Sequence, residues 1–200
     1  MFISFEGIDG SGKTTQIQLL KDYFVSKGLE VITLREPGGT IFSEKIRELL
    51  LSKEFVLNSF TELMLFEAAR SYLTENIIKP ALESNKVVLC DRFFDSTTAY
   101  QGYGRGMDKK FLTLCNQMAV SSVYPNITFY LNVKSEISRK RSEKKIADRI
   151  ESAGDDFFSK VQNGFDELAI MFPERIKNID ANLSIEQVFN QIKIIIENNN

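Results

Sequence analysis

The residues in this sequence best suited to chemistry are the eight that run from Gly7 to Thr14. They are Gly7, Ile8, Asp9, Gly10, Ser11, Gly12, Lys13 and Thr14, a complete match to the phosphate-binding loop pattern. Glycines let successive N–H groups converge on a phosphate at the start of a helix, where the helix dipole also favours negative charge. Lys13 would contact the β- and γ-phosphates of a nucleotide, and Thr14 would bind Mg²⁺. A chance match is disfavoured because an apolar run precedes the loop and a helical pattern follows it.

A second candidate element is the run from Val87 to Asp91. Its four apolar residues predict a buried strand, and a carboxylate at the end of such a strand is typical of the second Mg²⁺ ligand beside a phosphate-binding loop. We therefore expect Asp91 to help hold the ion, directly or through water. Ligands bind at the carboxyl ends of parallel strands, so Arg92 is expected to face a phosphate group. The alternative is a surface arginine paired with a carboxylate of a helix.

Strands and helices must alternate to position these residues. Short segments rich in β-branched and aromatic residues predict five buried strands, at 2–5, 31–34, 87–90, 127–133 and, more weakly, 176–179. Helical patterns separate them, so the fold class is α/β, with a parallel sheet covered by helices on both faces. The helix after the loop should end at Gly28. A capping box at 184–187 should start the last helix, whose apolar stripe is expected in the core: Ile185, Val188, Phe189, Ile192 and Ile196.

Composition limits the classes of function. A length of 200 residues suits one α/β domain, and a formal net charge of −2 does not favour a nucleic-acid polymer as partner. The absence of histidine excludes histidine catalysis, and the two cysteines, Cys90 and Cys115, support neither a disulfide framework nor a metal site. The sequence has no apolar stretch of membrane-spanning length and no basic leader. We therefore expect a cytoplasmic protein with a single domain over residues 1–200, acting away from membranes.

Four blocks of sequence, in the same order, resemble the bacterial thymidylate kinase family, and the resemblance covers nearly the whole chain. They are residues 7–15, 35–40 (Arg-Glu-Pro-Gly-Gly-Thr), 66–70 (Phe-Glu-Ala-Ala-Arg) and 91–102 (Asp-Arg-Phe-Phe-Asp-Ser-Thr-Thr-Ala-Tyr-Gln-Gly). The resemblance implies a P-loop NTPase-type three-layer sandwich with a five-stranded parallel sheet and a short helical lid. It implies transfer of the γ-phosphoryl group of ATP to dTMP, giving dTDP for dTTP synthesis, with Mg²⁺ as cofactor and a homodimeric assembly.

The resemblance also implies an acceptor site for dTMP. Phe66 would stack on the thymine ring and Arg70 would donate to a base carbonyl, which agrees with the flat face of an aromatic ring and the planar guanidinium donor. Without the resemblance, Phe66 would be assigned to the core. Arg47 and Arg92 would bind the acceptor phosphate, and Asp9 would lie near the sugar hydroxyl and the metal. The other positions around the base and sugar are Glu36, Thr97, Gln101 and Tyr100, the last where a ribose 2′-hydroxyl would otherwise sit.

Residues 139–149 carry six cationic side chains against two carboxylates. A mobile cationic segment that closes over ATP can neutralise charge on the transferred phosphoryl group, and relatives with glycine at the position of Gly10 carry a catalytic arginine in this lid. We therefore predict a lid at about residues 136–151. The predicted catalytic residues are Asp9, Lys13, Arg92, Arg141 and Arg149. Lys144 or Lys145 is an alternative for the γ-phosphoryl contact, although a lysine cannot bind two oxygens as a guanidinium does.

Three other functions compete with this interpretation. A deoxynucleoside kinase shares the loop and the fold, but its hydroxyl acceptor needs a base and offers no phosphate to Arg47 and Arg92. A GTPase-like switch, a nucleotide-dependent binding module, would need an Asn-Lys-x-Asp segment, whereas two valines follow Asn85-Lys86. A catalytically silent scaffold is disfavoured by the intact Lys13. A phosphate acceptor, with a second pKa of about 6, already has deprotonated oxygens near neutral pH and needs no general base.

Overall fold

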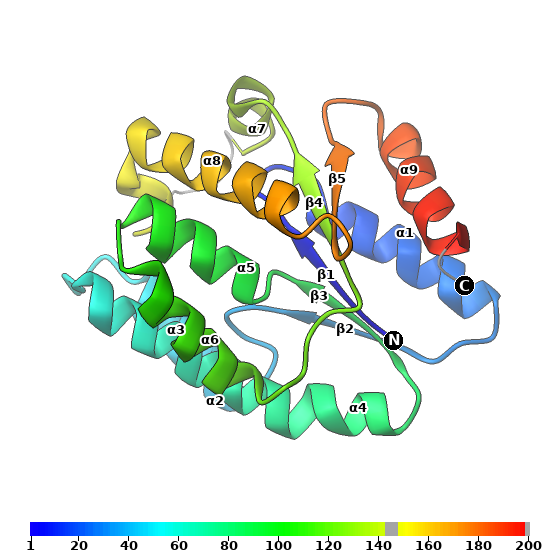
Figure 1. Cartoon of the computed structure of the whole chain (residues 1–200), viewed down its shortest axis with the longest axis horizontal. Helices are drawn as coiled ribbons and strands as arrows, with labels where there is room; N and C mark the ends of the chain where they lie inside the picture. Colours follow the sequence, from blue (N-terminus) through cyan, green and yellow to red (C-terminus); the bar gives the residue numbers. More distant parts are fainter. Residues whose placement is uncertain (143–147, 199–200) are drawn as a thin grey trace.

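A computed structural model describes residues 1–142 and 148–198, in which strands and helices alternate (Figure 1). The strands are β1 (Phe2–Glu6), β2 (Val31–Arg35), β3 (Val87–Asp91), β4 (Ile127–Asn132) and β5 (Ile176–Asp180). Each lies where the sequence predicts a strand, and no end differs by more than one residue from the predicted one. Short apolar runs between helical patterns were therefore a sufficient signal for the strands.

The strands form one parallel sheet in the order β2-β3-β1-β4-β5. All five residues of β1 and the first four of β3 are buried, as expected for strands covered on both faces. β1 pairs with β3 in a register that sets Phe5 beside Asp91. The loop that follows β1 and the turn that follows β3 therefore leave the sheet next to each other, at its carboxyl edge.

Helices cover both faces of the sheet, which gives the three layers predicted from the sequence (Figure 1). α1 and α9 pack together against β3 and β5 on one face, while α4 and α8 contact the same two strands from the other. In the described residues, no helix combines the length and apolar character needed to cross a membrane. The helices are α1 (Lys13–Ser26), α2 (Ile41–Leu51), α3 (Ser59–Leu73), α4 (Lys79–Glu83), α5 (Phe94–Thr97), α6 (Lys109–Val120), α7 (Ser135–Ser142), α8 (Asp155–Met171) and α9 (Ile185–Asn198), with π-helical segments at Thr74–Ile78 and Thr98–Gly104 and a 3₁₀ turn at Glu151–Ala153.

The predicted helix ends are confirmed, but one core assignment is wrong. α1 ends at Ser26, and Gly28 follows with a φ of 79°. The capping box is present, since Ser184 N donates to the Gln187 side chain at 3.1 Å and Gln187 N donates to Ser184 Oγ at 3.3 Å. Ile185 is 53% exposed although it belongs to the apolar stripe of α9. It is the first residue of that helix, and its side chain lines the cleft described below.

Candidate active site

The loop from Gly7 to Thr14 connects β1 to α1, and two of its glycines are required by its backbone. Gly7 has a φ of 132°, and a Cβ at this position would lie 2.7 Å from the carbonyl oxygen of Leu131. Gly12 begins α1 with a left-handed φ of 96°. Only glycine adopts these conformations at little cost. The loop therefore turns tightly enough to place the start of α1, with its free N–H groups, beside a cleft at the sheet edge.

This donor cleft is lined by five of the eight predicted ATP-binding residues: Asp9, Gly10, Gly12, Lys13 and Thr14. The other three, Gly7, Ile8 and Ser11, shape the loop instead of lining the cleft. The buried ammonium of Lys13 donates to the carbonyl oxygens of Gly7 and Ile8, both at 3.1 Å. Burial and the nearby Arg92 lower the pKa of Lys13. The rest of the lining was not predicted from the sequence: Thr15, Ile17, Gln18, Thr33, Leu34, Arg35, Gly39 and Ile185.

The two predicted metal ligands lie together in this cleft. Thr14 Oγ1 donates a hydrogen bond to Asp91 Oδ2 at 3.1 Å, and both residues line the donor cleft. Magnesium prefers oxygen ligands and is usually bound by one or two protein groups together with waters and substrate phosphates. The described residues contain no group of three or more acidic, histidine or cysteine side chains that could enclose a metal. A hydroxyl and a carboxylate at the edge of a phosphate loop fit Mg²⁺ held in this open manner.

Arg92 lies between the donor cleft and a second, smaller pocket, and lines both. Its Nη1 donates to Gly7 O at 2.8 Å and its Nη2 to Asp9 Oδ1 at 3.0 Å. The guanidinium also lies over the ring of Tyr100, 5.2 Å from its centroid. Burial alone would lower the pKa of Arg92, but the acidic groups around it, including Asp9 and Asp91, raise it. The turn after β3 therefore holds a permanent cation where the two pockets meet.

All nine residues predicted to bind dTMP line the second pocket, the acceptor pocket: Asp9, Glu36, Arg47, Phe66, Arg70, Arg92, Thr97, Tyr100 and Gln101. They come from six segments of the chain, namely the loop after β1, the segment after β2, α2, α3, α5 with the turn before it, and the π-helical segment that continues α5. The remaining lining residues were not predicted to bind dTMP: Pro37, Leu51, Phe93, Ser96, Asp148, Ile150 and Glu151. Phe93 and Ser96 belong to the block 91–102 and Pro37 to the block 35–40, but no contact with dTMP was predicted for them. Asp148, Ile150 and Glu151 lie in the predicted lid.

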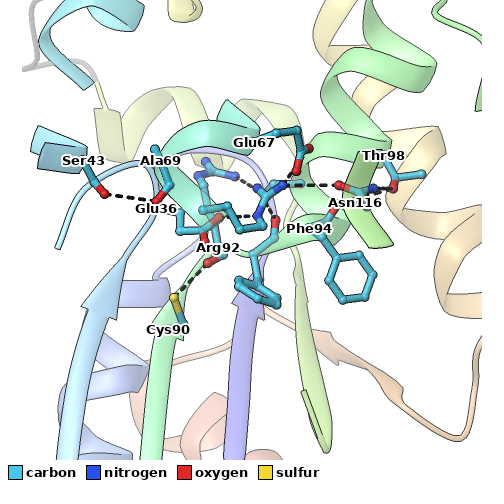
Figure 2. A network of polar contacts seen from close by, with 12 residues as sticks. Glu36, Ser43, Glu67, Ala69, Cys90, Arg92, Phe94, Thr98 and Asn116 are labelled. Atoms are coloured by element: carbon cyan, nitrogen blue, oxygen red, sulfur yellow. Dashed lines mark hydrogen bonds and ion pairs between the residues drawn. The ribbon is translucent and has the colours of Figure 1, made fainter. Parts of the chain in front are cut away.

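Arg70 is fixed by a buried network at the back of the acceptor pocket. Its Nε donates to Glu36 at 2.7 Å and its Nη1 to Glu67 at 2.9 Å, with Asn116 at 3.3 Å. Figure 2 labels Glu36, Glu67 and Asn116, the three side chains that accept these hydrogen bonds from Arg70. Burial raises the pKa of Glu36 to about 7 and also raises that of Glu67, although Arg70 opposes both shifts. Two carboxylates and one cation thus fix the orientation of a side chain that faces the pocket.

Arg149 is not brought to the donor cleft. Its Nη1 pairs with Glu62 at 2.7 Å, and its Nε donates to the carbonyl oxygen of Leu50 at 2.8 Å. Glu62 is buried, also pairs with Arg105, and accepts a hydrogen bond from Gln101 at 2.9 Å. A buried carboxylate is a stronger partner for the guanidinium than an open cleft. In this structure Arg149 therefore supports the wall of the acceptor pocket, and its contact with ATP stays a prediction.

Arg141, the other predicted lid arginine, lines the donor cleft. Its Nη1 donates to the carbonyl oxygens of Ala181 and Gly10, at 3.2 and 3.4 Å. Both acceptors are backbone oxygens, and through the contact with Gly10 the planar cation covers the loop. The alternatives Lys144 and Lys145 lie outside the described residues.

The parallel sheet, the loop after β1 and the carboxylate that ends β3 place the chain among the P-loop phosphotransferases, with a second pocket for a small acceptor. A family model described as thymidylate kinase matches residues 5–192. The chain belongs to the thymidylate kinase family.

Individual relatives agree with this assignment. A thymidylate kinase of Prosthecochloris aestuarii is 47% identical, over 96% of this chain and 91% of the relative. One of Thermosipho africanus is 45% identical over 98% of both chains. The crystal structure of thymidylate kinase from Ehrlichia chaffeensis superposes with a TM-score of 0.81, at 39% identity over 98% of each chain. The resemblance inferred from the four sequence blocks is confirmed.

Proposed function

We propose that this protein transfers the γ-phosphoryl group of ATP to dTMP, giving ADP and dTDP for dTTP synthesis. Membership of the thymidylate kinase family supports this reaction. The observation that carries it is that the donor cleft and the acceptor pocket share two arginines, Arg47 and Arg92, together with Asp9 and Glu36. Cations at the junction of two pockets suit two polyanionic reactants, whose mutual repulsion must be screened before they can meet in line.

Different residues of the chain then position the two reactants. The N–H groups of the loop and Lys13 hold the donor phosphates at the start of α1, and Arg47 and Arg92 bind the acceptor phosphate. Arg141 covers the donor side. Mg²⁺, when bound by Thr14 and Asp91, would neutralise charge on the donor phosphates. No side chain has to remove a proton, because the acceptor phosphate is already deprotonated near neutral pH.

Other residues of the acceptor pocket recognise the nucleoside. Phe66 offers an aromatic face to the thymine ring, and Arg70 offers a fixed donor to a base carbonyl. Thr97 and Gln101 complete the surroundings of the base, and Glu62 fixes Gln101 through a hydrogen bond of 2.9 Å. Tyr100, buried and next to Arg92, occupies the place where a ribose 2′-hydroxyl would clash, which favours a deoxyribonucleotide.

Helices α2, α3 and α6 support a homodimer. α3 packs against both α2 and α6, and the three helices carry exposed apolar residues: Ile41, Phe42, Leu49, Phe60, Tyr72, Phe111, Leu114 and Met118. Two ring pairs lie across neighbouring helices, Phe42 with Tyr72 at 4.6 Å and Phe60 with Phe111 at 6.1 Å. An apolar surface that spans three helices is expected to be covered. Sedimentation analysis should give a dimer mass at micromolar concentration, and a monomer would contradict this assembly.

We also propose that residues 1–200 act as one domain, with a lid at about residues 136–151, in the cytoplasm. One buried apolar cluster supports the single domain, because it joins residues of β1, α1, β4, α8 and α9. Part of the proposed lid, residues 143–147, lies outside the described residues.

The test of function compares dTMP with thymidine in an ADP-release assay with Mg-ATP, using Lys13→Ala as the inactive control. We expect ADP release with dTMP and none above background with thymidine. Release with thymidine alone would establish the deoxynucleoside kinase instead. ATP hydrolysis that neither acceptor stimulates would favour the nucleotide-dependent switch.

A further inference from the structure

Glu6, the last residue of β1, is fully buried and is not part of the lining of either pocket. Its Oε1 accepts a hydrogen bond from the backbone N–H of Phe93 at 2.7 Å, and its Oε2 accepts one from Ser96 Oγ at 2.5 Å. One oxygen therefore binds the turn after β3, which carries Arg92, and the other binds α5, the helix that follows this turn. The residue immediately after Glu6 is Gly7, the first residue of the phosphate loop.

The turn needs such support because Arg92 adopts a φ of 68°. Residues with long side chains rarely adopt this left-handed conformation, and it persists only where the surroundings hold it. The backbone N–H of Arg92 donates to Phe5 O at 2.9 Å. Its Nη1 donates to Ser96 Oγ at 3.3 Å, and that hydroxyl is the one bound to Glu6. Glu6 thus makes two contacts near Arg92. It binds Phe93, the next residue in the chain, and it binds Ser96 of α5, whose hydroxyl also accepts from the Arg92 guanidinium.

We propose that Glu6 is a positioning residue for Arg92, fixing its guanidinium between the donor cleft and the acceptor pocket by binding Phe93 and Ser96. This inference rests on the proposed phosphorylation of dTMP, because Arg92 is assigned there to the acceptor phosphate. Glu6 itself reaches neither reactant. Its effect on the reaction passes through the direction of the Arg92 side chain, where a misplacement of about 1 Å can cost two orders of magnitude in rate.

The charged and polar groups around Glu6 indicate whether glutamine or aspartate is the conservative replacement for it. Burial and then Asp95 raise the pKa of Glu6 to about 8, while Ser96, Arg92 and the Phe93 N–H oppose the shift. The other ionisable groups whose charges interact with Glu6 are Lys13, Cys90, Tyr100 and Arg175. A protonated Glu6 can accept from Phe93 N–H and donate to Ser96 Oγ. Glutamine makes the same two contacts, whereas aspartate is one methylene shorter and cannot reach both partners.

The kinetic test compares Glu6→Gln and Glu6→Asp, with Ser4→Ala as the matched control. Ser4 is buried on the same strand and the same sheet face, and its hydroxyl bonds to Thr128 Oγ1 at 2.7 Å, away from both pockets. Glu6→Asp should lower kcat/KM for dTMP by about tenfold or more and leave KM for ATP unchanged. Glu6→Gln and Ser4→Ala should keep both constants near those of the parent. The proposal would be overturned if Glu6→Asp lowered kcat/KM equally for dTMP and for ATP, or lowered it for neither.

A double-mutant cycle separates action through Arg92 from a general loss of structure. In an Arg92→Lys background, Glu6→Asp should cause little further loss, because the interaction that it weakens is already gone. Full additivity of the two losses would overturn the proposal.

A readout that needs no substrate separates this inference from the proposed function. In NMR spectra, the guanidinium N–H signals of Arg92, assigned by their loss in Arg92→Lys, should stay protected from exchange in Glu6→Gln. They should exchange rapidly in Glu6→Asp and also in Ser96→Ala, which breaks the same link and replaces Glu6→Asp if that variant does not fold. Unchanged protection would refute the role of Glu6. If the parent protein does not phosphorylate dTMP, the proposed function is refuted instead. The NMR test of Glu6 can still be made in that case, because it needs no substrate.

Discussion

The guanidinium of Arg92 lies 3.0 Å from Oδ1 of Asp9, and both residues line the donor cleft and the acceptor pocket. The pair links the phosphate loop to the turn after β3, two segments that are adjacent because β1 and β3 are neighbours in the sheet. The junction of the two pockets is therefore built from a cation and a carboxylate that follow the carboxyl ends of two neighbouring parallel strands.

Lys13→Ala should lower kcat by orders of magnitude with a modest change in stability. Charge on the leaving phosphates grows during transfer, so a cation at this position acts mainly in the transition state. The side chain bonds to backbone carbonyls and to Ser11, so its removal unpairs no carboxylate in these contacts. Steady-state rates and thermal unfolding should be measured beside Lys21→Ala, a lysine on the same helix outside both pockets. Nearly normal turnover would remove Lys13 from its assigned role.

Arg70→Ala should raise KM for dTMP, leave KM for ATP almost unchanged and destabilise the fold. Removing the cation leaves Glu36 and Glu67 buried without their shared partner, which typically costs about 3–5 kcal/mol. The free energy of unfolding from denaturant titration gives this cost. Adding Glu36→Gln should recover part of the stability but not the affinity for dTMP. A raised KM for ATP alone would move Arg70 out of the acceptor site.

Arg141→Ala should mainly change the kinetic constants, whereas Arg149→Ala should mainly lower the stability. Arg141 lines the donor cleft, and within the described residues its hydrogen bonds are with backbone oxygens, so its loss should lower kcat or raise KM for ATP at nearly constant stability. Arg149 pairs with buried Glu62, so its loss should lower the melting temperature. Both properties should be measured for each variant. Negligible kinetic losses in both would leave Lys144 or Lys145 as the lid cation.

The raised pKa of Glu6 predicts a pH-dependent stability. Unfolded Glu6 ionises near 4.5 and folded Glu6 near 8, so the folded state binds more protons between these values. Stability from this group therefore falls as pH rises, by up to about 1.4 kcal/mol per pH unit. Denaturant titrations at pH values across this window should show a smaller loss for Glu6→Gln than for the parent. Parallel curves for the two proteins would contradict the raised pKa.

Replacing dTMP by dUMP should give slower but detectable turnover. The two differ by one methyl group, and an apolar pocket discriminates a methyl by only about 1–3 kcal/mol. The ratio of kcat/KM for the two acceptors measures this difference. Equal efficiency would show that the base methyl has no close contact in the pocket.

Local patterns predicted the features that depend on contiguous residues. The strands followed from short apolar runs, and the phosphate loop followed from its spacing of glycines. The acceptor pocket followed from the family blocks, since Phe66 and Arg70 lie one turn apart on α3 while Thr97, Tyr100 and Gln101 share one continuous helical segment. Residues that one helix presents together stay together in the fold, so their proximity could be predicted.

Contacts between distant segments could not be predicted in this way. Glu62 is one of many carboxylates in the sequence, and only the fold buries it where Arg149 can pair with it. Asn116 on α6 reaches Arg70 only because α6 packs against α3. Ile185 is the first residue of the apolar stripe of α9, but it lines the donor cleft and does not enter the core. Each case depends on the packing of elements far apart in the chain, which leaves no trace in local sequence.

The most direct test of the whole account is a crystal structure with dTMP and a non-hydrolysable ATP analogue bound together. We expect the phosphate of dTMP between Arg47 and Arg92, its thymine ring against Phe66 with a base carbonyl at Arg70, and the analogue's phosphates on the loop at Lys13. A dTMP molecule bound away from Phe66, Arg70 and Arg92 would contradict the account.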